Sequence, residues 1–210
     1  MINSISISTD NFFLKSLNEL KIDSLRKELL KEIADFLISE IKTTNKVNLN
    51  FICIHNSRRS QLAQVWSSFA ANYYNIKSIE SFSGGTIVTS FYRSTVKTLQ
   101  SVGFNFQLIE FSHLNPEYLI NYKNCTNPIV GFSKLYDNDH NPKPYIAITI
   151  CSSADANCPY IPESTKRFYL PFSDPKLYDK SPYKTEKYLE INKQIAGEIH
   201  FIFKIISESI

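Results

Sequence analysis

Hydrophobic residues near the start of the chain repeat with the period of a helix. From Leu25 to Ile41 apolar side chains recur at a three-to-four spacing, which predicts a helix that Asp23 or Ser24 can cap. A shorter helix is expected over residues 10–20. We interpret residues 1–45 as an N-terminal helical extension, either an extra layer on the main domain or an arm that binds a partner or a second copy.

From Val47 onward, strand-like and helical patterns alternate. Residues 47–53 pass from alternation to a wholly apolar run, as expected of a strand that enters the centre of a sheet. Three further elements are expected: a helix over residues 60–74, a strand over 76–82 that Ser83-Gly84-Gly85 breaks, and a helix from Ser90 to Gly103. This order implies right-handed crossovers and a parallel sheet.

The second half of the chain contains an irregular stretch between regular elements. Prolines and polar residues over 115–144 predict loops around a hairpin, whereas Tyr145–Ile150 is the clearest buried strand. The last helix is expected to start at Ser181-Pro182, with an apolar stripe of Leu189, Ile195, Ile199, Phe203 and Ile206. We therefore predict one α/β domain over residues 46–210, interrupted by an insertion at about 115–144.

Composition and charge exclude several classes of protein. With 43% hydrophobic and 20% charged residues, the chain is not wholly disordered. Its 23 basic and 20 acidic residues leave a formal charge of +3, without the basic stripe of a nucleic-acid binder. Its longest apolar run is too short to cross a membrane, and the first residues show no secretory signal. Four cysteines do not make a disulfide scaffold, so we expect a cytoplasmic protein with functional thiols.

The most informative segment joins the first strand of the sheet to the helix that follows. It begins with Cys53 and contains Arg59 six residues later. A loop that wraps into a helix N-terminus directs backbone N–H groups at one point, where a tetrahedral oxyanion can bind. The same groups stabilise a thiolate, and a guanidinium can grip two anion oxygens. The expected oxyanion-binding residues are Ile54, His55, Asn56, Ser57, Arg58, Arg59 and Ser60. The alternative is a strand-end cysteine beside a surface arginine.

This segment resembles a known family. Cys-Ile-His-Asn-Ser-Arg-Arg-Ser-Gln-Leu-Ala looks like the phosphate-binding loop of low-molecular-weight protein tyrosine phosphatases and of thioredoxin-coupled arsenate reductases. The resemblance runs from about Val47 to the last helix and does not cover residues 1–45. It implies a three-layer fold around a mainly four-stranded parallel sheet. Ser-Gln after the arginine is more similar to the reductases than to the phosphatases, which usually have Ser-Pro there.

A second cysteine pair favours the reductases. Cys151-Ser-Ser-Ala-Asp-Ala-Asn-Cys158-Pro resembles the segment that carries their two resolving cysteines. If residues 151–158 were helical, the two Cα atoms would lie about 10.5 Å apart, whereas a disulfide needs roughly 7 Å or less. Joining the two thiols would therefore unwind the segment, whose residues are weak helix formers. Two unrelated thiols remain the alternative, and a zinc site does not fit the spacing. Cys125 has no counterpart in the pattern and is interpreted as a structural or incidental thiol of the insertion.

The rest of the expected site follows from the resemblance. Phe172-Ser173-Asp174-Pro175 is similar to the family's Asp-Pro loop, whose aspartate is the general acid. Some reductases bind potassium beside the loop. Asn56 and Ser83 fall at ligand positions, but Gln64 replaces the usual glutamate, so at most a weak potassium site and no other metal is expected. His55 stands where glycine is common, and Arg58 puts a second cation beside the nucleophile or is a solvated charge.

Three hypotheses of function follow. The leading one is an arsenate reductase in which Cys53, Cys151 and Cys158 relay electrons, Arg59 holds the anion and Asp174 supplies a proton. It binds no cofactor and takes electrons from thioredoxin or a similar reductant. The second is a phosphatase that cleaves phosphotyrosine or small phosphomonoesters through a phosphocysteine. The third is a non-catalytic redox sensor or partner-binding module that uses the loop to sense anions. Neither nucleic acid nor membrane is expected as a partner.

Overall fold

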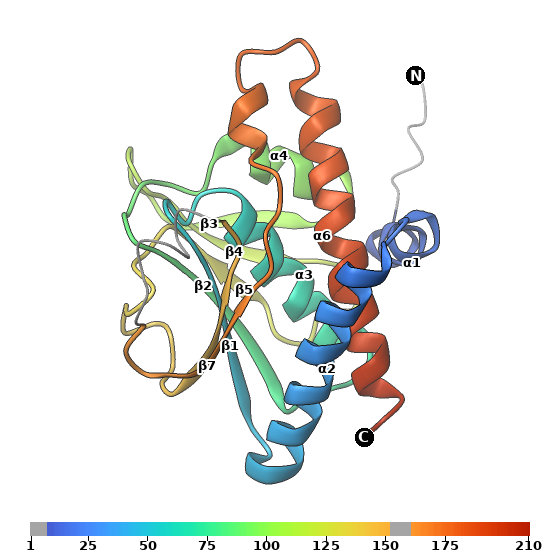
Figure 1. Cartoon of the computed structure of the whole chain (residues 1–210). Helices are drawn as coiled ribbons and strands as arrows, with labels where there is room; N and C mark the ends of the chain where they lie inside the picture. Colours follow the sequence, from blue (N-terminus) through green and yellow to red (C-terminus); the bar gives the residue numbers. More distant parts are fainter. Residues whose placement is uncertain (1–7, 152–160) are drawn as a thin grey trace.

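The chain folds around a parallel sheet of four strands. A computed structural model describes residues 8–151 and 161–210, so Cys158 lies outside the described residues. The sheet has the order β2-β1-β6-β7, and a smaller antiparallel sheet has the order β3-β4-β5 (Figure 1). The elements are α1 Thr9–Glu19, α2 Ser24–Thr44, β1 Val47–Cys53, α3 Arg59–Tyr73, β2 Ile79–Gly85, α4 Arg93–Ser101, β3 Asn105–Glu110, β4 Glu117–Asn121, β5 Ile129–Gly131, β6 Tyr145–Thr149, β7 Ser164–Tyr169, the 3-10 helix η1 Pro175–Tyr178 and α6 Lys184–Ser207. The predicted fold class is confirmed.

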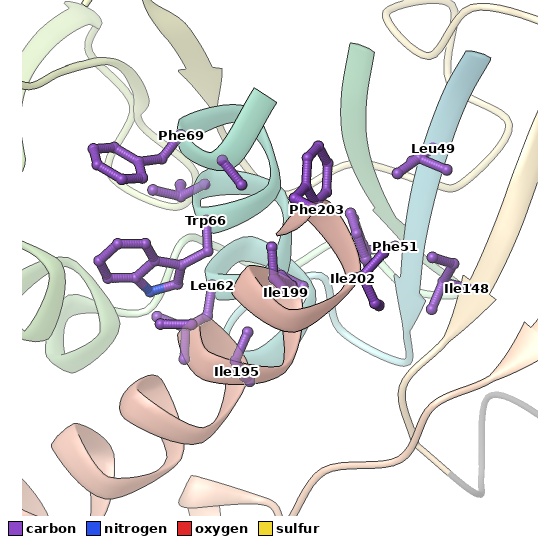
Figure 2. Packing of buried hydrophobic residues seen from close by; sticks show 14 of the residues in the cluster. Leu49, Phe51, Leu62, Trp66, Phe69, Ile148, Ile195, Ile199, Ile202 and Phe203 are labelled. Carbon is purple, nitrogen blue, oxygen red and sulfur yellow. The ribbon is translucent and has the colours of Figure 1, made fainter. Parts of the chain in front are cut away.

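Helices α2, α3 and α6 lie on one side of the large sheet (Figure 1). Between them and the sheet lies the main hydrophobic core, in which Trp66 of α3 and Ile195 of α6 are fully buried. Figure 2 shows how side chains of α3 and α6 meet those of β1 and β6. Burying this apolar surface is the dominant favourable contribution to folding. It also fixes the start of α3 against the end of β1, where the cysteine loop lies.

The opposite side of the sheet is covered in part by the stretch between β5 and β6. The carbonyl of Tyr136 accepts a hydrogen bond of 2.9 Å from Nδ2 of Asn50 on β1. Tyr136 packs against the buried cluster of Ile52, Tyr145, Ala147 and Ile161. The expected hairpin within residues 115–144 is confirmed, because β4 pairs antiparallel with β5. Strand β4 also pairs antiparallel with β3, which completes the second sheet. The stretch after β5 contacts the first sheet through a bridge between Leu135 and Gly85.

Helices α1 and α2 share the core of the main domain. Asp23 caps α2 as predicted, with its side chain accepting from the backbone N–H of Arg26. Phe13 of α1 is fully buried and stacks on the rings of Trp66 and His200. The apolar face of α2 differs from the predicted one at its start, since Leu25 is 77% exposed. The domain boundary at residue 45 stays a prediction, because these helices share one hydrophobic cluster with the rest of the chain.

Two predictions about β2 and α4 are wrong. Strand β2 continues through Ser83-Gly84-Gly85, where Gly84 pairs with Ile52 and Gly85 with Cys53. The glycines are required by close approach rather than by a turn, since a Cβ on Gly84 would lie 2.2 Å from the Cα of Tyr136. Ser90 does not cap α4, which begins after Tyr92 without a side-chain cap. Gly103 does follow the helix with a positive φ of 100°.

The C-terminal part also differs from prediction. Helix α6 begins at Lys184 rather than at Pro182, because Ser181 forms a turn that ends in a hydrogen bond from the N–H of Lys184. Leu189 is 39% exposed, whereas the other predicted stripe residues of α6 are buried. Strand β7 was not predicted, since its sequence is mostly polar and it pairs only at the sheet edge. In the ranges that the structure describes, no helix has the length and hydropathy of a membrane span.

Candidate active site

Cys53 ends β1 in the middle of the sheet and begins the predicted loop. Its Sγ lies 3.0 Å from Oγ of Ser60, in the first turn of α3. Nδ2 of Asn56 donates to the same hydroxyl oxygen at 2.9 Å. Because the Ser60 oxygen accepts this bond, its proton is available for the sulfur. The hydroxyl can therefore donate to a Cys53 thiolate, in agreement with the role expected of a nucleophile.

The loop is held in shape by Asn56, which is fully buried with a positive φ of 43°. Asn tolerates this left-handed conformation better than most residues. Its Oδ1 accepts from the backbone N–H of Lys134 at 2.9 Å and from Nε2 of Gln61 at 3.1 Å. Gln61 also donates to the carbonyl of Phe132 at 2.8 Å. The loop is thus anchored by buried polar contacts to α3 and to the stretch after β5.

Arg59 joins the loop to the expected acid. Its Nη2 donates to Oδ2 of Asp174 at 2.6 Å, and its Nη1 donates to the carbonyl of Phe172 at 2.9 Å. The other carboxylate oxygen of Asp174 caps η1 by accepting from the N–H of Lys176. The structure therefore brings the predicted nucleophile loop, arginine and acid together, although they are 121 positions apart from first to last in the sequence (174 − 53).

The interpretation of Arg58 as a cation beside the nucleophile or a solvated charge is not supported by its contacts. Its Nη2 pairs with Asp179 at 2.7 Å, its Nε donates to the hydroxyl of Tyr188 at 2.8 Å, and its guanidinium lies 3.8 Å from the ring centroid of Tyr92. Despite the desolvation by burial, the hydrogen bond from Tyr188 and the charge of Arg58 hold the pKa of Asp179 below its ordinary value. The Arg58 side chain therefore fastens the loop to α6.

His55 contributes a half-buried imidazole to the loop. Burial and the nearby cations Lys176 and Arg58 lower its pKa, so the neutral ring is favoured. Its carbonyl accepts from the hydroxyls of Thr89 and Ser133, each at 2.9 Å. The backbone of His55 is thus fixed by two hydroxyl groups, one from the stretch before α4 and one from the stretch after β5.

The two residues considered for potassium are both buried, and each takes part in its own set of polar contacts. The Ser83 hydroxyl donates to Oε1 of Gln64 at 2.5 Å, and Gln64 donates in turn to the carbonyl of Val130 at 3.2 Å. Oδ1 of Asn56 is occupied by the two donors described above. The described ranges 8–151 and 161–210 contain no cluster of three or more His, Cys, Asp or Glu that could hold a metal. The weak potassium site stays a prediction.

Cys151 follows the neighbouring strand β6. In the parallel pairing of β1 and β6, Ile52 lies opposite Thr149, and the N–H of Ile150 donates to the carbonyl of Ile52 at 3.0 Å. Cys53 and Cys151 are both buried members of the main hydrophobic cluster. Cys151 comes two residues after the end of β6, so the two cysteines lie at the carboxyl ends of neighbouring strands.

The other cysteines have different places. Cys125 is half-buried, forms no disulfide, and lies between β4 and β5, three residues after Tyr122. Cys158 lies outside the described residues, so its role stays a prediction. Three residues that hold the loop were missed by sequence reasoning, and all reach it from distant segments: Lys134, Asp179 and Tyr188. No spacing in the sequence signals them, because their partners are set by tertiary contacts.

Fold and site together define an α/β protein with a cysteine–arginine loop for a tetrahedral oxyanion. A comparison with models of known protein families gives no match. Among curated proteins, the chain is similar to arsenate reductase 2 of Staphylococcus epidermidis, with 27% identity over 132 residues, covering 62% of this chain and 80% of the relative. It is 28% identical over 131 residues to the arsenate reductase of Staphylococcus aureus strain Newman, covering 62% and 79%. The resemblance to this family is confirmed, and the comparisons agree with an enzyme.

The solved structures to which the chain is similar include both phosphatases and arsenate reductases. A low-molecular-weight phosphotyrosine phosphatase from Vibrio cholerae superposes with a TM-score of 0.49 at 14% identity, covering 74% of this chain and 93% of the other. A thioredoxin-dependent arsenate reductase of Corynebacterium glutamicum gives a TM-score of 0.45 at 21% identity, covering 96% and 85%.

Proposed function

We propose that this protein is an arsenate reductase that uses Cys53, Cys151 and Cys158 in sequence and passes the final disulfide to a thioredoxin-like reductant. The proposal is supported by the similarity to curated arsenate reductases. It is also supported by the Cys53 loop, in which Ser60 can donate to the thiolate and Arg59 stands beside Asp174.

One observation carries the proposal further than an oxyanion loop alone would. Cys53 ends β1, and Cys151 follows the paired strand β6 by two residues. Both cysteines are buried in the same hydrophobic cluster. A disulfide requires a Cα separation of about 4.4–6.8 Å. The first thiol exchange therefore requires Cys151 to come within this distance of Cys53, which lies at the end of the adjacent strand.

The chemistry proceeds in three steps. The Cys53 thiolate attacks arsenate, an oxygen leaves as water with a proton from Asp174, and a sulfur–arsenic bond forms. The Cys151 thiolate then attacks the Cys53 sulfur, and the electron pair of the broken sulfur–arsenic bond stays on arsenic, which leaves as arsenite. Cys158 attacks Cys151 and releases Cys53 as a thiolate. The two electrons lost by Cys151 and Cys158 are restored by the dithiol of the reductant.

A single-turnover experiment tests this relay. Fully reduced protein is mixed with arsenate in the absence of a reductant, arsenite is counted, and disulfides are mapped by mass spectrometry. We expect one arsenite per chain and a Cys151–Cys158 disulfide. The Cys158→Ser variant should stop at a Cys53–Cys151 disulfide after one arsenite, whereas the Cys125→Ser variant is the matched control and should behave as wild type.

Two results would contradict the relay. Multiple turnovers by Cys158→Ser with thioredoxin as reductant would remove Cys158 from the mechanism. Retention of all four thiols, with no arsenite formed, would reject arsenate reduction altogether.

A phosphatase is the second candidate, and one observation favours it. Cys53, Arg59 and Asp174 form a complete set for a phosphocysteine route without either resolving cysteine. In that case Cys151 and Cys158 would protect Cys53 from over-oxidation. Hydrolysis of an aryl phosphate by a Cys151→Ser, Cys158→Ser double variant at the wild-type rate, together with the absence of arsenite above, would favour this candidate.

A further inference from the structure

A second cavity lies between the outer edge of β2 and the stretch around β5. Its volume is about 910 Å³, and none of Cys53, Arg59 or Asp174 lines it. One wall is the second half of α3, and another is β2 from Ile79 to Phe82. A cavity of this size is within the range that small-molecule sites occupy. None of the predicted oxyanion-binding residues 54–60 lines it.

Lys134 is the unusual residue of this cavity. The residue is 3% exposed, and its ammonium lies 4.5 Å from the ring centroid of Phe132, which also lines the cavity. In residues 8–151 and 161–210, no acidic side chain lies within ion-pair distance of it; Glu117 acts on it only at longer range. Burial lowers the pKa of Lys134 to about 8. A buried ammonium without a counter-charge is costly, and an anionic ligand would remove that cost.

The backbone of Lys134 is fixed on both sides. Its N–H donates to Oδ1 of Asn56 at 2.9 Å, and its carbonyl accepts from the N–H of Gly85 at 2.8 Å. These bonds anchor the stem from which the side chain extends into the cavity. A cation held on a fixed backbone is preorganised, so little conformational entropy is lost when it binds an anion.

The other lining residues indicate the kind of anion. Glu80 is an acidic residue of the cavity wall, but it pairs with Lys46 at 3.4 Å. Lys77 adds a further positive charge. Aromatic rings supply flat surfaces elsewhere in the cavity lining, namely those of Phe82, Tyr122, Phe132 and His140, and the ring of Phe132 lies beneath the ammonium. Positive charge next to flat apolar surfaces suits an acidic group on a planar ring.

We propose that this cavity is a second binding site, which takes a small aromatic carboxylate with its carboxylate on the Lys134 ammonium and its ring among the aromatic side chains. The site is independent of arsenate reduction and of phosphatase chemistry. A tetrahedral oxyanion has its own site at the Cys53 loop, where backbone N–H groups and Arg59 are available. The two sites are therefore expected to bind their ligands at the same time.

Calorimetry with naphthalene-2-carboxylate as the probe tests the proposal. We expect saturable binding to the wild-type protein, with the affinity unchanged by saturating inorganic phosphate, a tetrahedral anion that the thiols do not reduce. The neutral amide of the same ring, naphthalene-2-carboxamide, should bind about tenfold or more weakly, because a hydrogen bond to a charged group is worth about 1.5–3 kcal/mol. This comparison requires no variant, so it does not depend on whether a substituted protein folds.

Variants provide the second test. Lys134→Met should weaken carboxylate binding at least tenfold and leave amide binding unchanged, while Lys134→Arg keeps the charge and part of the affinity. Lys77→Met, on the same cavity, is the control and should change the affinity by less than about threefold. Equal affinities of the carboxylate and the amide, displacement of the probe by inorganic phosphate, an unchanged affinity in Lys134→Met, or no binding at millimolar probe would each overturn the proposal.

Discussion

The ion pair between Arg26 of α2 and Glu198 of α6 offers a quantitative test of how the N-terminal helices support the site. Nη2 and Nε of Arg26 lie 2.7 and 3.0 Å from Oε2 of Glu198. Nη2 also donates to the carbonyl of Pro171 at 2.9 Å, three residues before Asp174. The Glu198 side chain is 2% exposed and that of Arg26 is 16% exposed. The pair is therefore buried, and it ties α2 to the segment that carries the acid.

Substitution of Arg26 by methionine keeps an unbranched stem but removes the charge. It leaves Glu198 buried without its partner, and the loss of one member of a buried pair costs about 3–5 kcal/mol. For a chain of this length, that corresponds to a fall in Tm of roughly 6–20 °C. The assay is urea unfolding at pH 7, with the Arg26→Met, Glu198→Met double variant as the control. The double variant should recover most of the loss, because it removes the unpaired charge.

The pH dependence of the single variant has a definite sign. Burial already raises the pKa of Glu198, against the opposing effect of Arg26. Without Arg26 the pKa rises further, so the folded state binds a proton that the unfolded state has released. The free energy of unfolding of Arg26→Met should therefore increase as the pH falls from 7 towards 5. A loss below about 1 kcal/mol at pH 7, or a double variant no more stable than the single one, would refute the reasoning.

Three further predictions concern the loop and its surroundings. Asp174→Asn should lower turnover by about 10²–10⁴-fold, and equal activity would remove Asp174 as the acid. Gly84→Ala should cost at least about 1–3 kcal/mol in urea unfolding, because the new Cβ would meet backbone 2.2 Å away; an unchanged midpoint would contradict the close approach. His55→Gln should leave the arsenate affinity between pH 7 and 8 unchanged in calorimetry, because the lowered pKa of His55 keeps the ring neutral there. A charge-dependent loss in that range would show that the ring is protonated.

Sequence patterns predicted the elements that carry the loop. Strand β1 and helix α3 are each apolar along most of their length. The spacing of their apolar residues therefore predicts their secondary structure directly. The glycines at 84 and 85 show where this reasoning fails. Glycine breaks a strand on average, but here the neighbouring backbone lies too close for a side chain. Such a requirement is invisible until the packing is known.

The sequence did not predict strand β7 or the start of α6 for a related reason. Strand β7 is an edge strand whose polar side chains face solvent, so it lacks the apolar signal of a central strand. Ser181 and Pro182 have the composition of a helix start, but a hydrogen bond from Lys184 to the Ser181 carbonyl makes them a turn instead. Local preferences of about 1 kcal/mol are easily overridden by tertiary contacts.

The sequence by itself determined which reactive groups this protein has and which elements carry them: a thiol at a strand end, an arginine six residues later, and a second pair of cysteines after a buried strand. These features are local, because hydrophobic periodicity and short motifs depend on neighbours in the chain. Only the tertiary structure decided the partners of the charged side chains. Arg58 pairs with Asp179, Arg26 with Glu198, and Lys134 with a cavity rather than a carboxylate. The energy of a charge depends on its burial and on the charges around it, which in this chain come from distant segments.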